Sequence, residues 1–207
     1  KIPDYRIEET KNLVSVLGNE VVEEFPWKNS MKPSTSDNVE GVLRRTWRPA
    51  LSVVGSDGMP STTNAGNVLR PYTTLQLSIR IPPMVDPKKA VNAIERILEY
   101  DIPYGASVKL EFEEAAEGWN APKSKNWLLD AIEKASKEYF NQMPCAIGEG
   151  GTIPFMAMLG KQFPEAQFVI TGVLGPQSNA HGPNEFLHIP FAKNLTCCIS
   201  SIITDFK

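Results

Sequence analysis

The strongest indication of the fold of this 207-residue chain is the run Phe168-Val169-Ile170-Thr171-Gly172-Val173-Leu174. It is too uniformly apolar for a half-exposed strand and short enough for a strand covered on both faces. The loop Asn179-Ala180-His181-Gly182-Pro183-Asn184-Glu185 follows it. Ligands bind beyond the carboxyl ends of strands in open α/β sheets, and imidazole is the commonest metal ligand. The position therefore suits a metal-binding His181, although a lone loop histidine is more often an ordinary surface residue.

A second glycine-rich loop, Gly148-Glu149-Gly150-Gly151-Thr152-Ile153-Pro154, leaves another short apolar run. Gly150 and Gly151 would let the backbone approach a ligand closely, or they would only make a sharp turn between a strand and a helix. The loop lacks the third glycine of a dinucleotide fingerprint and an acidic partner after a following strand. Nucleotide binding is therefore not predicted.

The second half of the chain, residues 118–207, alternates helical and strand patterns. We expect a helix from about residue 124, a helix starting within 153–159, the buried strand 168–174 and a last helix over 191–206. This alternation is typical of α/β layers. Two or three strands would need cover on both faces that the chain is too short to supply, so we expect this half to complete a larger sheet.

The first half, residues 1–117, shows the order helix, strand, strand, helix, strand. The predicted elements are a helix over 5–22, a strand through 51–53, a strand over 72–81, a helix that begins at Asp86 and a strand over 108–112. Both helices carry an apolar stripe that we expect to pack on the sheet. The order favours an α+β sandwich, with helices on one face of an antiparallel sheet.

Arg80 lies on the polar face of the strand predicted over 72–81. In that stretch Leu75, Leu77, Ile79 and Ile81 share one face, while Thr74, Gln76, Ser78 and Arg80 share the other. Successive side chains of a strand point to opposite faces. The alternation therefore keeps the guanidinium out of the core, where it is free to bind a ligand or to remain in water.

Composition narrows the function classes. The chain is 42% hydrophobic and 22% charged, as globular proteins are, and its net charge of -3 comes with interspersed acids and bases. This pattern predicts no nucleic-acid partner and no membrane segment. Three cysteines without zinc-finger spacing favour a reducing compartment, so we expect a cytoplasmic protein. The chain opens at Lys1 without a strand or cap signal, as if cut from something longer.

Five ordered motifs resemble the carnosinase and aminoacylase family of two-zinc exopeptidases, most closely its carnosinase-like branch. They are Trp47-Arg48-Pro49-Ala50-Leu51-Ser52-Val53, Ala65-Gly66-Asn67-Val68-Leu69, Leu77-Ser78-Ile79-Arg80, Glu149-Gly150-Gly151-Thr152-Ile153-Pro154 and His181-Gly182-Pro183-Asn184-Glu185. The resemblance covers almost the whole chain from Gly41 onward. Each motif alone would be weak, and their order makes the combination specific.

The resemblance implies an α/β chain of two parts. Residues 1–117 would be an incomplete lid domain, which pairs two copies into a homodimer, and residues 118–207 would be the last part of the zinc domain. The complete enzyme would hold two zinc ions and hydrolyse small peptides or N-acyl amino acids. The chain is thus expected to be the C-terminal portion of a metallopeptidase.

The resemblance also assigns site residues. His181 would bind zinc, with Glu185 or a backbone carbonyl orienting its ring. Arg80 matches a lid arginine that the family uses on its substrate, and a guanidinium can bind both oxygens of a carboxylate. Asn67 and Thr152 match neighbouring polar contacts, and Gly151 would let the backbone approach the substrate. The chain departs from the branch at Gly148, where related sequences often have arginine.

Most of the family's metal ligands have no counterpart in this sequence. The early histidine and aspartate pair, the bridging aspartate, the paired glutamates before the lid and the general base are absent. His188 fits no ligand position, and Glu113-Glu114 is better explained as a solvated strand end. We therefore expect the chain alone to be inactive. The alternative is a non-catalytic dimerisation module with relic site loops, although such a module would have no need for His181 and Arg80 together.

Overall fold

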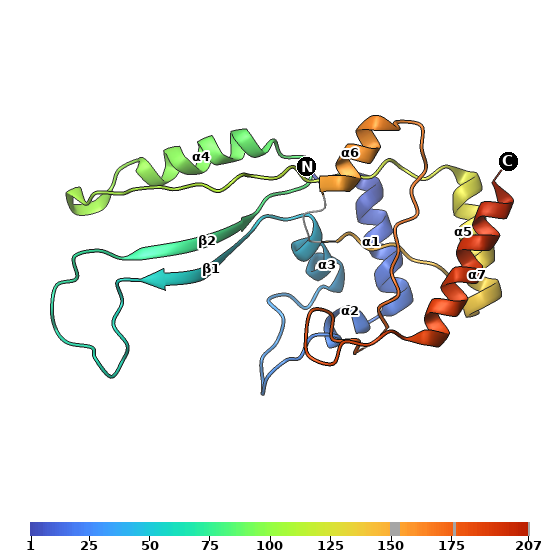
Figure 1. Cartoon of the computed structure of the whole chain (residues 1–207), viewed down its shortest axis with the longest axis horizontal. Helices are drawn as coiled ribbons and strands as arrows, with labels where there is room; N and C mark the ends of the chain where they lie inside the picture. Colours follow the sequence, from blue (N-terminus) through green and yellow to red (C-terminus); the bar gives the residue numbers. More distant parts are fainter. Residues whose placement is uncertain (150–153, 176, 207) are drawn as a thin grey trace.

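The computed structural model describes residues 1–149, 154–175 and 177–206. Its elements are α1 (Asp4–Leu17), α2 (Glu20–Glu23), α3 (Asn38–Thr46), β1 (Ala50–Asp57), β2 (Thr74–Arg80), α4 (Pro87–Glu99), the 3₁₀ turn η1 (Pro103–Gly105), α5 (Asn126–Phe140), α6 (Pro154–Gln162) and α7 (Ile189–Asp205). Figure 1 shows two regions, which we call the arm, residues 50–118, and the body, formed by the other described residues. The predicted α+β character is confirmed, and the division of the chain at residue 117 stays a prediction.

The arm is built on a hairpin. β1 and β2 pair antiparallel from Ala50 opposite Arg80 to Asp57 opposite Thr74, with an irregularity between Val53 and Gly55. The alternating pattern thus predicted β2 correctly. The strand predicted over 108–112 is wrong, because this segment runs back along the arm without regular structure (Figure 1). Alternation describes the faces of a segment, whereas a strand also needs a neighbour that completes its hydrogen bonds.

α4 begins where the sequence predicts. The Asp86 side chain accepts a hydrogen bond from the backbone N–H of Lys89 at 3.1 Å, and Pro87 occupies the first turn, where no N–H is needed. Its apolar stripe, however, is not buried as predicted, since Ile97 remains 70% exposed and Leu98 40%. A two-stranded sheet is too narrow to cover the face of such a helix.

The first core of the body lies among α1, α2 and α3. Leu13, Val21 and Val42 are buried there, with Val14, Leu17 and Val22 packed around them. The helix predicted over 5–22 is interrupted at Gly18, which adopts a positive φ of 58°. Its predicted packing on the sheet is wrong, because its apolar stripe packs against α3 instead.

The second core lies between α5 and α7. It consists of Leu128, Ala131, Ala135, Cys198 and Ile202. All except Cys198 come from the apolar stripes that predicted these helices. His188 caps α7, since its Nδ1 accepts a hydrogen bond from the backbone N–H of Phe191 at 3.1 Å. The three cysteines are free thiols.

The strand predicted over 168–174 is also wrong. The structure assigns no strand to this segment, and Ile170 and Leu174 are 58% and 56% exposed. Within the described residues, the second half consists of three helices and connecting segments, so it does not form the predicted α/β layer. A central strand depends on neighbouring strands at both edges, and the described residues place none beside this run.

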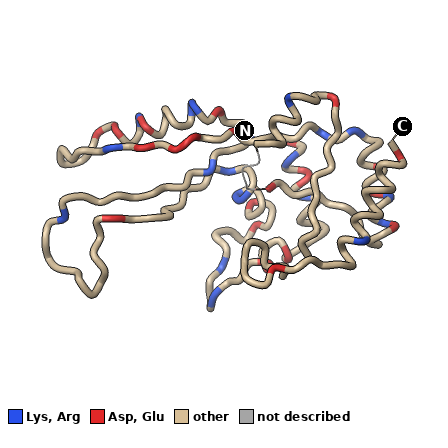
Figure 2. Tube along the Cα trace, in the orientation of Figure 1, with Lys and Arg blue, Asp and Glu red and all other residues tan. Residues whose placement is uncertain are grey.

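Charged side chains are distributed over both regions. Figure 2 shows both acidic and basic residues along the arm and the body, with acidic residues gathered on the segment that runs back along the arm. None of the helices described here combines the length and the apolarity that crossing a bilayer would require.

Candidate functional site

The loop before α7, residues 177–185, has an unusual backbone. Gln177, Asn179, His181 and Asn184 adopt positive φ values of 63°, 55°, 61° and 58°. Residues other than glycine seldom adopt positive φ values, although asparagine does so more readily than most. The loop is thus a specific conformation that its side chains must support.

Internal hydrogen bonds hold this loop together. The backbone N–H of Gly182 donates to the Asn179 carbonyl at 2.9 Å, and the Asn179 side-chain amide donates to the Pro183 carbonyl at 2.6 Å. Ser178 is 4% exposed, and its hydroxyl donates to the Gly175 carbonyl at 2.7 Å. Ser178 therefore bonds the start of the loop to the segment just before it, while Asn179 closes its turn.

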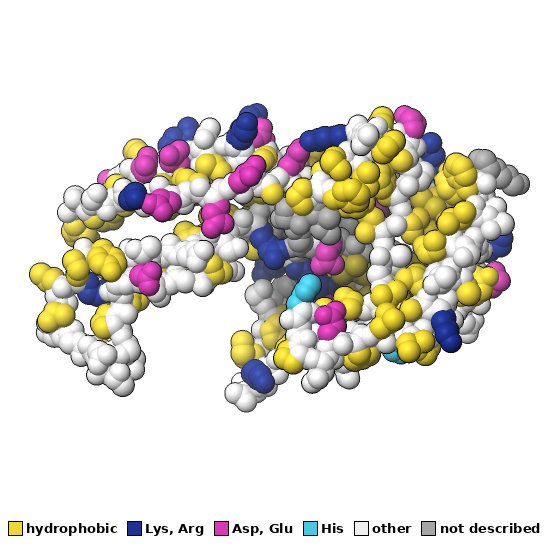
Figure 3. Space-filling model, viewed as in Figure 1, with side chains coloured by type: hydrophobic (Ala, Val, Ile, Leu, Met, Phe, Trp, Pro, Cys, Tyr) yellow, Lys and Arg dark blue, Asp and Glu magenta, His cyan; other side chains and the backbone are white. Residues whose placement is uncertain are grey.

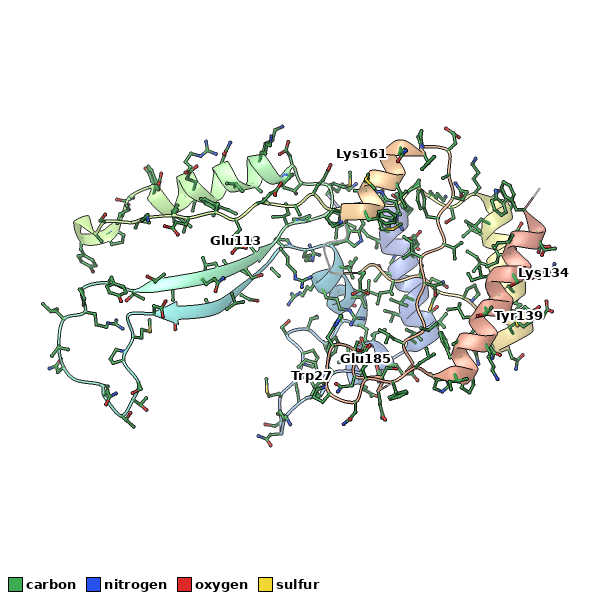
Figure 4. The ribbon with its side chains drawn as sticks, viewed as in Figure 1. Trp27, Glu113, Lys134, Tyr139, Lys161 and Glu185 are labelled. Carbon is green, nitrogen blue, oxygen red and sulfur yellow. The ribbon has the colours of Figure 1, made fainter. Side chains whose placement is uncertain are left out.

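His181 is exposed at the turn of this loop. Its backbone N–H donates to Oε2 of Glu185 at 3.2 Å, and Figure 4 labels Glu185 within the loop. The family resemblance predicts that Glu185 or a backbone carbonyl orients the imidazole ring. In the structure the carboxylate instead contacts the backbone of the residue that carries the ring.

The structure separates the other predicted site residues. Arg80 is the exposed last residue of β2, opposite Ala50 at the root of the arm. Asn67 belongs to the connection between β1 and β2, which forms the far end of the arm in Figure 1, and the loop of His181 lies on the body. Gly151 and Thr152 lie outside the described residues. One chain therefore does not bring the segments of Asn67 and His181 together.

The described residues include the kinds of side chain that bind zinc, but they do not bring together enough of them to form a zinc site. Histidine nitrogen and carboxylate oxygen are ordinary zinc ligands, and a catalytic zinc site uses about three protein ligands. Over the ranges 1–149, 154–175 and 177–206, no group of three or more His, Cys, Asp or Glu residues is arranged to hold a metal. Nδ1 of His188 is engaged in capping α7. His181 is thus a candidate for one ligand of a larger set.

A charged cluster joins the body to the root of the arm. Nε and Nη2 of Arg48 donate to the two carboxylate oxygens of Glu40 at 2.7 Å each, and Nε of Arg44 donates to Oε1 at 3.0 Å. These hydrogen bonds, first that of Arg48, hold the pKa of Glu40 below its ordinary value. Glu40 belongs to α3, whereas Arg48 stands just before β1, so the pair ties the two elements.

This cluster was not predicted from the sequence, nor were the close approach of Gly118 to the backbone of Pro83 and that of Gly148 to the side chain of Thr46. A Cβ added to Gly118 would lie 2.5 Å from Cα of Pro83, and a Cβ on Gly148 would lie 3.2 Å from Cβ of Thr46. Gly148 thus leaves little space for the arginine common at this position in the resembled branch. Arg48 belongs to the Trp47-Arg48-Pro49 motif, but its partner Glu40 lies eight residues earlier, so the motif alone does not reveal the pair.

The returning segment of the arm carries the acidic pair considered earlier. Glu113, labelled in Figure 4, and Glu114 are exposed. They belong to no cluster of potential metal ligands within the described ranges.

Comparison with known proteins gives one sequence relative. The chain is 30% identical over 156 residues to a cysteinylglycine-S-conjugate dipeptidase from Corynebacterium striatum. The match covers 70% of this chain and 33% of the relative, so the chain spans about a third of that protein's length. No protein-family model matches the sequence.

Solved structures that resemble this chain include two with well-matched folds. An M20 family metallo-carboxypeptidase from Sulfolobus solfataricus is similar with a TM-score of 0.72 and 16% identity, over 98% of this chain and 45% of that protein. Human carnosine dipeptidase 1 is similar with a TM-score of 0.64 and 17% identity, over 99% of this chain and 42% of that protein. Similarity at these identities establishes the arrangement of the elements alone.

Proposed function

Because the chain belongs to the carnosinase-like M20 peptidase family, we propose that it forms part of a metal-dependent dipeptidase. Relatives named for dipeptide substrates support this class of reaction, and N-acyl amino acids remain chemically similar candidate substrates. The proposal rests mainly on the loop that contains His181, because hydrogen bonds already hold this loop in a specific conformation. A pure dimerisation module would not need that loop.

His181 would contribute one nitrogen ligand to a zinc site. The remaining ligands and the general base would come from residues outside those described. Zinc, when bound, supplies Lewis-acid polarisation of the scissile carbonyl. The contribution of this chain is to hold the imidazole at a defined place, while Gly151 and Thr152 would contact the substrate.

Zinc titration by calorimetry tests the role of His181. The chain supplies one candidate ligand, so we expect weak binding and no zinc-dependent dipeptidase activity. In the complete enzyme, His181→Ala should abolish activity and zinc retention, whereas His188→Asn should preserve both, because asparagine can still cap α7. A stoichiometric, sub-micromolar site in the chain itself, abolished by His181→Ala, would contradict the proposal.

Arg80 is proposed as the anchor for a substrate carboxylate, with Asn67 as a further polar contact. Its position on the polar face of β2, at the root of the arm, leaves the guanidinium exposed for a ligand. A bidentate contact in a partly dry site contributes about 2–3 kcal/mol, so Arg80→Ala should lower kcat/KM by roughly 30- to 150-fold. Arg80→Lys should restore little, because an ammonium lacks the planar fork.

The matched substrates are a dipeptide with a free carboxylate and the same dipeptide with an amidated terminus. Loss of activity confined to the free carboxylate supports the anchor. An equal loss on both substrates, or no loss on either, would leave Arg80 as a solvated strand residue.

We also propose that the arm pairs two copies of the protein in a cytoplasmic homodimer. Leu51 and Val53 of β1 are 61% and 56% exposed, and in the described chain β1 pairs only with β2. An unpaired apolar strand edge favours association with another chain. These features would equally support the alternative of a dimerisation module without catalysis. Light scattering at tens of micromolar decides the pairing, since a monomer there would contradict it.

A further inference from the structure

We infer that Glu185 is a positioning residue that holds the backbone of His181 in its left-handed conformation. The inference rests on the proposed function, in which the imidazole of His181 is a metal ligand. It concerns how the chain places that imidazole, and it assigns to the last residue of the His181-Gly182-Pro183-Asn184-Glu185 motif a role at the backbone.

The starting observation is the φ of 61° at His181. An L residue with a Cβ seldom adopts this conformation, and interactions of its surroundings then stabilise it. The direction of the Cα–Cβ bond, and therefore the place of the imidazole, depends on this backbone angle. Because metal–ligand distances vary by only about 0.2 Å, a change of φ at His181 would remove the ring from any ligand position.

The carboxylate of Glu185 supplies the compensation. Its Oε2 accepts the backbone N–H of His181 at 3.2 Å, across four residues of the turn. Among the ion pairs formed by the described residues, none involves Glu185. The contact with the backbone is therefore the interaction in which this side chain takes part, and an exposed charged acceptor suits a backbone donor well.

Asn179 and Gly182 complete the support from the other side of the turn. The Asn179 amide donates to the Pro183 carbonyl at 2.6 Å, and the Gly182 N–H donates to the Asn179 carbonyl at 2.9 Å. A Cβ at Gly182 would lie 2.6 Å from Nδ2 of Asn179. Only glycine at position 182 therefore lets the side-chain amide of Asn179 lie this close to the backbone. In this turn the backbone N–H of His181 donates to Glu185.

The base of the loop is fixed independently. Ser178 is 4% exposed and bonded to the Gly175 carbonyl, and its own carbonyl accepts the backbone N–H of Phe186 at 3.2 Å. Removal of the Glu185 carboxylate should therefore loosen the turn at His181 while the ends of the loop stay in place. This separation makes a local measurement informative.

Amide hydrogen exchange of His181, followed by NMR on this chain, is the first measurement. Glu185→Ala should speed exchange at His181 by about fivefold to tenfold, as expected for one lost hydrogen bond. Glu185→Gln keeps a side-chain oxygen as acceptor and should stay within about twofold of the unmodified chain. The matched control, Asp130→Ala, removes an exposed carboxylate of α5 and should leave exchange at His181 unchanged.

Zinc alone is the second probe, with the imidazole resonances of His181 as readout and those of His188 as internal reference. In Glu185→Ala the zinc concentration that half-saturates the His181 response should rise about tenfold, as for the loss of a residue that supports a metal ligand. Glu185→Gln should restore it. The midpoint of thermal unfolding should stay unchanged in both variants, which separates positioning from general stability.

The outcomes are distinguishable. Exchange at His181 that is equal in Glu185→Ala and the unmodified chain overturns the inference. Faster exchange with an unaltered zinc response also overturns it, because the carboxylate would then hold the loop without positioning the ring. If zinc leaves the His181 resonances of the unmodified chain unchanged, the proposed function loses its ligand, and exchange at His181 alone decides whether Glu185 supports the backbone.

Discussion

In the body, the apolar faces of the helices pack against one another, whereas in the arm the apolar faces of the helix and the strands remain exposed to solvent. The hydrophobic side chains that are buried in the described structure all belong to the body: Leu13, Val21, Val42, Leu43, Trp47, Leu128, Ala131, Ala135, Ala157, Cys198 and Ile202. In the arm, Leu77 remains 37% exposed and Ile97 70%. Figure 3 shows apolar side chains at the surface of the arm as well as the body.

The difference teaches that an amphipathic pattern needs a second layer. α5 and α7 each bury a stripe because each supplies the surface that the other needs. The arm has two strands, one helix and a returning segment, and an isolated hairpin is at best marginally stable in water. Exposed apolar faces on such an arm favour a partner surface, which agrees with the proposed pairing of two arms.

The largest expected effect contrasts one leucine of each region. Leu128 is 1% exposed in the core between α5 and α7, so Leu128→Ala should lower the free energy of unfolding by about 2–5 kcal/mol. Leu77→Ala in β2 should cost less than about 1 kcal/mol, because its side chain is already partly in water. Urea unfolding of both variants measures the difference. Equal losses would mean that the arm buries Leu77 in solution, as a dimer would.

A smaller effect is expected at the root of the arm. Gly118→Ala would place a Cβ 2.5 Å from Cα and 3.0 Å from the carbonyl oxygen of Pro83, so backbone must move. Overpacking of this kind costs about 1–3 kcal/mol. Gly66→Ala, where nothing lies within 4 Å, is the matched control and should change stability by less than about 0.5 kcal/mol. Thermal unfolding of the two variants measures the difference. Identical midpoints would show that the backbone around Gly118 and Pro83 shifts to accept the Cβ without loss of stability.

The smallest expected effect is a loss of stability at low pH. The pKa of Glu40 is lowered, chiefly by its hydrogen bonds to Arg48 and then Arg44, so the unfolded chain binds a proton more readily than the folded one. The pair should therefore stabilise the fold above the ordinary glutamate pKa and lose this contribution as pH falls through the folded pKa. The stability gap between the unmodified chain and Glu40→Gln should narrow with acid. Urea unfolding at neutral and acid pH measures the gap, and a gap of the same size at both pH values would contradict this prediction.

Local patterns predicted the elements whose causes are local. Asp86 and Pro87 marked the start of α4, alternation marked β2, and stripes of period near four marked α5 and α7. The motif around His181 was visible for the same reason, because its residues are adjacent in sequence. These predictions rest on interactions within one element or one turn, so a single chain segment contains all the information they require.

Other features depend on partners distant in sequence. The runs 108–112 and 168–174 have the composition of strands, but neither has a neighbouring strand in the described structure. The capping role of His188 depends on the geometry at the start of α7, although the following Pro190 was a usable signal. The bidentate pair of Glu40 and Arg48 depends on how α3 approaches β1.

From the amino-acid order alone came α1, α5, α6 and α7 of the body, the two strands of the arm, the cap of α4 and the family resemblance that singled out His181 and Arg80. The tertiary structure added which surfaces those elements cover, that α1 packs on α3 instead of the sheet, and that Glu185 reaches the backbone of His181. The reason is physical: periodicity and capping act over a few residues, whereas burial and hydrogen-bond pairing require that another part of the chain, or another chain, arrive at the right place.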